Sequence, residues 1–319
     1  MRDDGVRGPR STQQIKLTPK DMIENRVVLV TGASGFTGKY LCSALRDLGA
    51  RVIELSELPS AAPDKFQCDL IDKSQVGDVI AEIRPDFVIH LAAISFVATE
   101  NPEAFYAVNV IGTCNLLHAL TNCTPEKIII ASSANIYGQV QGGQPISEDQ
   151  VPAPINHYAS SKLAMEHMAK TWFEELPFIV TRPFNYTGPG QDERFLIPKI
   201  VAHFAERKEQ IELGNLRVSR DFTYVGDVVE AYLLLLQSKS KSTVVNICSG
   251  ETCSLRQILN RLELLSGHEL KVRVNPELVR KNEIEVLRGD NSLLKELTGW
   301  APNYQLDEVL EMMLNSRID

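Results

Sequence analysis

Short apolar runs separated by helix-forming stretches constrain the fold of this 319-residue chain more than any other feature. Six such runs lie at 26–30, 51–55, 87–91, 128–130, 178–181 and 244–247. They do not alternate apolar with polar residues, as a strand with one solvated face would. Strands that are buried on both faces have this pattern, and they occur in parallel sheets covered by helices. The pattern therefore predicts an α/β fold with a doubly wound parallel sheet.

The regular pattern breaks after Arg182, which indicates a second, smaller lobe. Residues 183–190 are rich in Pro, Gly and Asn and are predicted to form a loop. Asp227 is expected to cap a helix that continues to Leu235. The tail, 252–319, shows two or three amphipathic helices, and the last has apolar residues at helical spacing from Leu306 to Leu314. The following division is predicted: a flexible N-terminal extension, 1–24; a dinucleotide-binding domain, 25–182 plus 223–250; and a C-terminal α/β substrate lobe, 183–222 plus 251–319.

Composition argues against several classes of protein. The formal net charge is −8 and no basic run is present, so a nucleic-acid partner is not expected. No apolar stretch has the length of a membrane span, and residues 1–20 lack the apolar core of a secretory signal. The six cysteines form no C-x-x-C pair and no cluster with metal-ligand spacing, as is typical of reduced cysteines in a cytoplasmic protein without a bound metal.

A glycine-rich loop follows the first predicted strand and opens the first predicted helix. Gly32, Gly35 and Gly38 form G-x-x-G-x-x-G. One glycine permits a tight turn, one lets the backbone approach a pyrophosphate, and one lets helix and strand pack closely. The helix N-terminus offers N–H groups and partial positive charge to phosphates. A purely structural glycine turn is the alternative, but the position between strand and helix favours a dinucleotide site that also includes Ser34, Phe36 and Thr37.

The end of the second strand bears on the choice between NAD(H) and NADP(H). An acidic residue there binds the ribose 2′-hydroxyl and repels a 2′-phosphate. Ser56 stands at this position and favours NADP(H). NAD(H) stays open, because Glu57 is one residue beyond and no Arg is close by to hold a phosphate. Asp69 and Leu70, after the third strand, are placed to meet the adenine, although Asp69 could instead cap a turn.

A tyrosine and a lysine stand four residues apart in Tyr158-Ala159-Ser160-Ser161-Lys162. On a helix these two side chains lie on one face. A neighbouring ammonium favours the phenolate, so Lys162 is expected to lower the pKa of Tyr158 towards neutral and suit it to acid–base work. Such a pair is common on solvated helices, but here Ser133 follows a strand about 25 residues upstream. Its hydroxyl could hydrogen-bond a substrate oxygen as charge develops.

From about Val27 to the C-terminus, the chain resembles the extended short-chain dehydrogenases. The motifs that carry the resemblance are T-G-A-S-G-F-T-G from Thr31, H-L-A-A from His90, S-S-A-N-I-Y-G from Ser132, Y-A-S-S-K from Tyr158, R-P-F-N from Arg182 and S-R-D-F from Ser219. The resemblance implies a Rossmann domain, with Ser133, Tyr158 and Lys162 as catalytic triad and Lys162 on the nicotinamide ribose. It also implies cofactor contacts from Leu91, Ala92 and Ala93. His157 is a departure, since relatives usually have Pro before the tyrosine.

The same resemblance implies one of three activities: 4,6-dehydratase, epimerase or reductase. Dehydratases of the family have an acidic pair directly after the catalytic hydroxyl residue, whereas Ala134 and Asn135 stand here, so a base for C5 is missing. The stretches 182–191 and 214–222 are similar to those of GDP-4-dehydro-6-deoxymannose reductases. We therefore expect reduction of the 4-keto group of a GDP-linked 6-deoxyhexose to GDP-rhamnose or its 4-epimer. A nucleotide-sugar 4-epimerase is the alternative, and a non-enzymatic redox sensor is disfavoured because Tyr158 and Lys162 are both present.

Four further residues are candidates for binding the nucleotide sugar. Arg220 and Arg280 match the positions at which the family clamps the diphosphate, and guanidinium groups suit phosphate oxygens. Arg280 lies in a charged run and could instead be a solvated surface residue. Asn185 and Gln191 are expected near the sugar nucleotide, although Asn185 could simply hold its loop together. The resemblance further implies a homodimer formed through helices near 105–120 and 158–176, where core burial would give the same apolar pattern.

Overall fold

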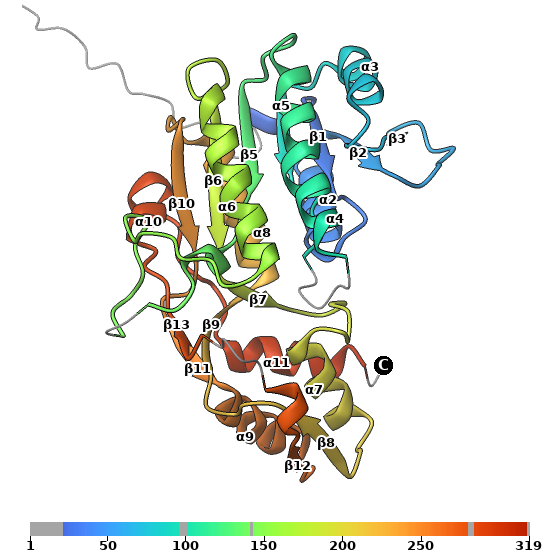
Figure 1. Ribbon diagram of the computed structural model, residues 1–319. Helices are drawn as coiled ribbons and strands as arrows, with labels where there is room; N and C mark the ends of the chain where they lie inside the picture. The colour runs from blue at the N-terminus through green and yellow to red at the C-terminus, as the bar shows by residue number, and fades with distance from the viewer. Residues whose placement is uncertain (1–21, 96–100, 141–142, 280–283, 318–319) are drawn as a thin grey trace, which may run out of the picture.

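The computed structural model describes residues 22–95, 101–140, 143–279 and 284–317 (Figure 1). Most of the predicted N-terminal extension therefore lies outside the described residues, and so does Arg280.

A parallel sheet forms the centre of the larger lobe, as predicted. In the described part of the chain it has seven strands in the order β10-β6-β5-β4-β1-β2-β3. Their bounds are β1 Val27–Thr31, β2 Arg51–Ser56, β3 Lys65–Gln67, β4 Phe87–His90, β5 Lys127–Ala131, β6 Phe178–Pro183 and β10 Thr243–Ile247. The short strand β3 has the sequence Lys-Phe-Gln. It pairs only with β2 at the edge of the sheet, so it needs no continuous apolar run.

Helices cover both faces of this sheet, which makes three layers (Figure 1). On one face lie α2 Phe36–Asp47, α8 Val225–Gln237 and α10 Ser292–Thr298. On the other face lie α3 Lys73–Ile83, α5 Thr113–Leu120 and α6 His157–Ala169. The helix α4, Pro102–Tyr106, continues through a π-helical segment η1, Ala107–Gly112, into α5. Burial of apolar side chains on both faces of the sheet explains why its central strands read as continuous apolar runs.

The remaining elements build a smaller lobe with its own apolar core. Its helices are α7 Leu196–Ala205, α9 Leu255–Ser266 and α11 Leu306–Asn315. Its strands are β7 Asn185–Thr187, β8 Gln210–Leu213, β9 Ser219–Tyr224, β11 Thr252–Ser254, β12 Lys271–Val274 and β13 Val286–Leu287. Strand β9 pairs with β7, β11 and β13, and β8 pairs with β12. The predicted boundaries between the two domains stay predictions.

Two local predictions were wrong. Residues 183–190 are not loop throughout, because β7 pairs in parallel with Phe222–Tyr224 of β9. Asp227 does not cap α8, whose N-cap residue is Tyr224. The Asp227 carboxylate instead accepts hydrogen bonds from the backbone N–H groups of Asn303 (3.1 Å) and Tyr304 (3.2 Å). Strand β9 runs directly into α8, and the acidic side chain is used to hold the segment that precedes α11.

In the described ranges, none of the helices is both long enough and apolar enough to cross a bilayer.

Candidate active site

The carboxyl ends of β1, β4, β5 and β6 lie next to one another at one edge of the sheet. Thr31 at the end of β1 is in register with His90 at the end of β4, and Ala131 of β5 is in register with Thr181 of β6. The strand order reverses between β1 and β4, the place where open α/β sheets bind ligands. The smaller lobe lies beyond this edge (Figure 1). Segments that are far apart in the sequence therefore meet at one site.

The glycine loop has no room for side chains at two of its three glycines. Gly32 has φ +69°, and a Cβ there would lie 2.8 Å from the backbone nitrogen of Ala92. A Cβ at Gly38 would lie 2.3 Å from the carbonyl oxygen of Gly32. Gly35 is the N-cap residue of α2 and supplies no side-chain acceptor to the first turn. The loop thus presents the exposed Ser34 and the N–H groups of a helix N-terminus, as a diphosphate requires.

The residues predicted for the adenosine half lie on the adjoining edge. Ser56 ends β2, and its Oγ accepts a hydrogen bond from the Leu58 N–H at 3.1 Å. Asp69 caps its own turn, accepting from the Ile71 N–H at 2.9 Å, which matches the alternative interpretation of that residue. Leu70 is buried, and its carbonyl accepts from the side-chain amide of Asn115 at 2.9 Å. An uncharged hydroxyl at position 56 leaves room for either a 2′-hydroxyl or a 2′-phosphate.

The three predicted catalytic side chains come from α6 and from the segment after β5. Tyr158 and Lys162 are one helical turn apart on α6, and both are buried. The Lys162 Nζ donates to the carbonyl oxygen of Ala131 at 2.8 Å. Ser133 is buried, and its Oγ accepts from the Asn135 N–H at 3.2 Å. His157 is the first residue of α6, a position where proline is also favoured because its N–H has no partner within the helix.

The pKa of Tyr158 moves in the direction opposite to the prediction. Burial raises it to about 12, and a hydrogen bond with Ser133 opposes this rise only in part. Burial also lowers the pKa of Lys162 to about 8. Removal of each group from water is the largest cause of both shifts, and the Lys162 ammonium donates to a backbone carbonyl. Tyr158 is therefore a neutral phenol at pH 7, and it can donate a proton.

The predicted sugar-nucleotide residues are brought together only in part. Asn185 and Ser133 line one small cavity of about 30 Å³. The Gln191 amide is engaged by its own loop, accepting from the Thr187 hydroxyl (2.7 Å) and donating to the Tyr186 carbonyl (3.4 Å). Arg220 on β9 donates to the carbonyl oxygens of Ser219 (2.9 Å) and Glu285 (3.4 Å). Gln191 therefore lies just after β7 and Arg220 near the start of β9, and neither lines the cavity that contains Ser133 and Asn185.

Sequence reasoning missed Tyr186. Its ring stacks on Phe36, with 6.3 Å between ring centroids, and its hydroxyl hydrogen-bonds the Thr37 hydroxyl at 2.9 Å. Nearby, the Tyr40 hydroxyl donates to the Pro189 carbonyl at 2.8 Å. The segment around β7 is thereby attached to the start of α2. No local sequence pattern could predict this contact, because Thr37 and Tyr186 are 149 positions apart.

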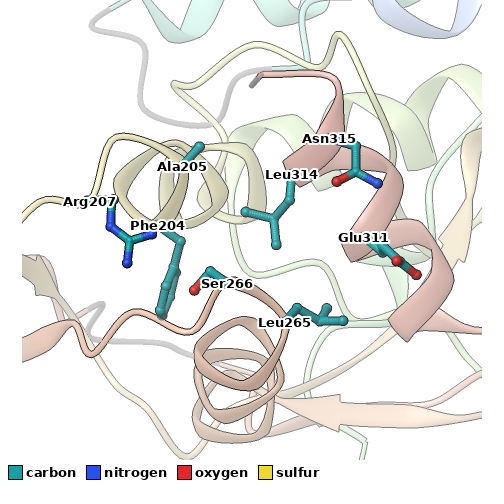
Figure 2. A pocket seen from close by; sticks show the side chains of 8 residues that line it. All are labelled: Phe204, Ala205, Arg207, Leu265, Ser266, Glu311, Leu314 and Asn315. Carbon is teal, nitrogen blue, oxygen red and sulfur yellow. The ribbon is translucent and has the colours of Figure 1, made fainter. Parts of the chain in front are cut away.

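A larger cavity, about 160 Å³, lies in the smaller lobe between α7, α9 and α11 (Figure 2). Phe204, Leu265 and Leu314 form its apolar wall, and Arg207, Glu311 and Asn315 lie at its rim. None of the predicted site residues lines it. The candidate active site is therefore the strand-end edge of the large sheet.

Comparison with known proteins agrees with this geometry. A family model described as GDP-mannose 4,6 dehydratase matches residues 29–313. A GDP-6-deoxy-D-talose 4-dehydrogenase of Aggregatibacter actinomycetemcomitans is 37% identical over 294 residues, which are 91% of this chain and 98% of that protein. A GDP-6-deoxy-D-mannose reductase of Pseudomonas aeruginosa is 36% identical over 299 residues, 90% of this chain and 96% of that protein. The solved structure of RMD from Pseudomonas aeruginosa with NADPH has a TM-score of 0.82 and 34% identity, covering 92% of this chain and 99% of its own.

Proposed function

The chain belongs to the GDP-mannose 4,6-dehydratase family of extended short-chain dehydrogenases, and from this premise we propose that it reduces the 4-keto group of a GDP-linked 6-deoxyhexose. The substrate would be GDP-4-dehydro-6-deoxy-D-mannose and the product GDP-D-rhamnose or its 4-epimer. One observation carries the proposal. A buried, protonated Tyr158 stands with Ser133 at the strand-end edge, and no carboxylate follows Ser133.

The residues of the site have separate tasks in this reaction. When bound, the reduced nicotinamide supplies a hydride for C4 of the sugar. Tyr158 donates its phenolic proton to the carbonyl oxygen at C4, so the ketone becomes a secondary alcohol. The Ser133 hydroxyl donates a hydrogen bond to the same oxygen as negative charge develops on it. Lys162 would hold the ribose of the cofactor. After the donation, Tyr158 is a phenolate, and a proton taken up from solvent would return it to the neutral phenol. Leu91, Ala92 and Ala93 would border the cofactor beside the glycine loop.

The glycine loop fits a dinucleotide, because close backbone packing at Gly32 and Gly38 holds an exposed turn at the N-terminus of α2, where phosphates bind. We propose NADP(H) as the cofactor. Ser56 presents a hydroxyl that does not repel a 2′-phosphate, and the solved RMD structure of Pseudomonas aeruginosa holds NADPH. NAD(H) would be the cofactor if Glu57, which is exposed one residue further on, turned towards the ribose.

The two residues that follow Ser133 favour reduction over dehydration. Ala134 is buried and has no ionisable group, and Asn135 is an amide whose backbone N–H binds Ser133. Elimination of water across C5 and C6 needs a base for the C5 proton and an acid for the leaving hydroxyl. Neither stands where dehydratases of this family have them, although the matching family model has a dehydratase name.

The sugar nucleotide would lie between the two lobes. Asn185 would contact the hexose beside Ser133, and Gln191 would support that loop. Arg220 and Arg280 would pair with the diphosphate. We further propose a homodimer through segments 105–120 and 158–176, where Ile111 is 49% exposed, and a cytoplasmic location, in keeping with the six cysteines having free thiols.

Reduction can be tested by incubating the protein with NADPH and 4-keto-6-deoxyhexoses on GDP, dTDP, CDP and UDP, while following the nicotinamide absorbance. We expect stoichiometric NADPH consumption with the GDP sugar. Tyr158→Phe should lower kcat by about 10²–10⁴-fold, because general acid catalysis contributes about that factor. Tyr304→Phe, which changes an exposed tyrosine of the smaller lobe, is the matched control and should leave kcat unchanged.

Two outcomes would contradict the proposal. An epimerase would retain NAD⁺ through purification and interconvert sugars without consuming NADPH. Full turnover by Tyr158→Phe would remove Tyr158 from the role of proton donor.

A further inference from the structure

Five buried polar residues are linked by hydrogen bonds beneath the candidate site, through their side chains and, at Asn109, also through the backbone carbonyl. The resulting chain starts at the end of β1, passes through the end of β4 and the η1–α5 junction, and ends on α6. Its members, all at most 2% exposed, are Thr31, His90, Thr113, Asn109 and Ser161. They come from five consecutive or neighbouring elements, β1, β4, η1, α5 and α6. The hydrogen bonds therefore join the strand ends below the glycine loop to the helix that carries Tyr158 and Lys162.

The protons in this chain can be placed by elimination. The Thr113 hydroxyl donates its single proton to the Asn109 carbonyl at 2.8 Å. It must therefore accept at its contact with His90 Nε2, also 2.8 Å long, which puts a proton on Nε2. Because burial lowers the pKa of His90 to about 3, the ring is neutral and Nδ1 is an acceptor. Thr31 donates to Nδ1 at 2.6 Å, and its oxygen accepts from the Ala92 N–H at 3.1 Å.

The other end of the chain reaches the backbone of Tyr158. Asn109 accepts from the Ile94 N–H at 2.9 Å and donates to the Ser161 Oγ at 3.0 Å. Ser161 in turn donates to the carbonyl oxygen of Tyr158 at 2.8 Å. Each proton in the chain has one acceptor, so the hydrogen bonds define a single arrangement. The Asn109–Ser161 bond joins α6 to the other members, so a sliding or rotation of the first turn of α6 would break this bond.

The segment that supplies Asn109 and Thr113 is π-helical rather than α-helical at η1. Wide turns of this kind are rare and are found mostly at functional sites. Here the wide turn directs the Asn109 side chain to α6 while Thr113, four residues later, faces His90. Apolar contacts of α6 with the sheet come mainly from its second half, at Met165 and Ala169. The first half of α6 combines a ring contact of Tyr158 with Phe105 and polar contacts, among them the Asn109–Ser161 bond.

We propose that Thr113 and Ser161 are positioning residues that hold the Tyr158 phenol in register with the cofactor loop, through the single tautomer of His90. The proposal rests on the proposed reductase function. It assigns these residues no contact with substrate or cofactor. Their effect is on the geometry of proton donation, so they should influence kcat and leave the KM for the sugar nucleotide unchanged.

The test compares Thr113→Val, Thr113→Ser and Ser161→Ala in NADPH-dependent reduction. Thr113→Val keeps the shape but removes the hydroxyl, and Ser161→Ala cuts the last link to Tyr158. Each should lower kcat by about tenfold or more with unchanged KM, because small misplacements of reacting groups are costly. Thr113→Ser, which retains the hydroxyl, should have a kcat close to that of the wild type. Thr223→Val is the control, since it removes a similarly buried hydroxyl that has no hydrogen-bond partner among the residues that the structure describes.

Wild-type kcat in both Thr113→Val and Ser161→Ala, or failure of Thr113→Ser to restore turnover, would overturn the proposal. A second measurement is independent of activity. Nitrogen-15 NMR of the His90 imidazole should show the neutral Nε2–H form from pH 5 to pH 8 in the wild type, and loss of that fixed form in Thr113→Val. If His90 titrated near its ordinary pKa, the proposed hydrogen-bond arrangement would be refuted. If the wild type kept this spectrum but did not consume NADPH, only the proposed function would be refuted.

Discussion

Arg182 and Lys162 are two buried cations, one on β6 and one on α6, whose surroundings differ sharply. Each side chain is 4% exposed. The Arg182 guanidinium donates to both carboxylate oxygens of Glu166, at 3.0 Å and 2.7 Å, and also to the Tyr137 hydroxyl at 2.9 Å. Lys162 has one hydrogen-bond partner among the described residues, the neutral carbonyl of Ala131. Correspondingly, Glu166 keeps the pKa of Arg182 raised, whereas burial lowers that of Lys162 to about 8.

Arg182 thus has the surroundings of a structural cation, whereas those of Lys162 are compatible with its proposed role in the reaction. A buried charge is tolerated when its partners replace water, as the fork of an Arg and a carboxylate do. In the part of the chain that the structure describes, Lys162 has no such set of partners in place of water, so burying its ammonium lowers the stability of the fold. The sites of greatest pKa perturbation tend to be functional for this reason. Glu166 stands one turn beyond Lys162 on α6. The helix that carries Lys162 therefore also carries the carboxylate that pairs with Arg182.

The largest expected effect comes from breaking the Arg182 pair. Arg182→Met leaves the Glu166 carboxylate, which is fully buried, without its counter-ion. We expect a loss of about 3–5 kcal/mol of unfolding free energy, measured by urea denaturation. The double variant Glu166→Gln with Arg182→Met removes both charges and should recover part of that loss. Equal destabilisation of the single and double variants would show that the ion pair is not what Arg182 contributes.

A smaller effect of opposite sign is expected at Lys162. The folded-state pKa of about 8 is below the ordinary 10.5, so between these values the unfolded chain binds the proton more strongly. Wild-type stability should therefore rise with pH across this window, by about 3 kcal/mol at most. Lys162→Met should be more stable than the wild type at pH 7, and this advantage should shrink between pH 8 and pH 10.5. A constant difference across that window would contradict the lowered pKa.

The smallest expected effect concerns a buried polar group that has neither charge nor partner. The Thr223 hydroxyl on β9 is buried without a hydrogen bond in the described structure. Thr223→Val replaces it with a methyl group of similar size, so thermal unfolding should show a gain of about 1 kcal/mol. Thr113→Val makes the same replacement where the hydroxyl has two partners and should lower stability. If both variants changed stability alike, partnering would not be the property that distinguishes these buried groups.

The fold and several site positions could be predicted from the sequence because their causes are local. Apolar runs report strands that are buried on both faces, glycines report a turn without room for side chains, and a spacing of four places Tyr158 and Lys162 on one helical face. The edge strand β3 and the short strand β7 escaped prediction, since each is held by a neighbouring strand rather than by its own pattern.

Energetic properties of the site could not be predicted, because they depend on tertiary burial. The spacing of Tyr158 and Lys162 predicts attraction between them but says nothing of how far both are removed from water. Likewise, Arg182 was identified only as part of a family motif, and its pairing with Glu166 depends on how α6 packs on β6. Partners brought together by folding leave no periodic signal in the sequence.

The contact of Tyr186 with Phe36 and Thr37 has a practical consequence for protein engineering. Through this contact, the segment around β7, which would select the sugar, packs against the glycine loop, which would hold the dinucleotide. A library of substitutions meant to change sugar preference around β7 will therefore also alter cofactor affinity, unless position 186 is kept as tyrosine. Screening such variants at saturating cofactor would separate the two effects.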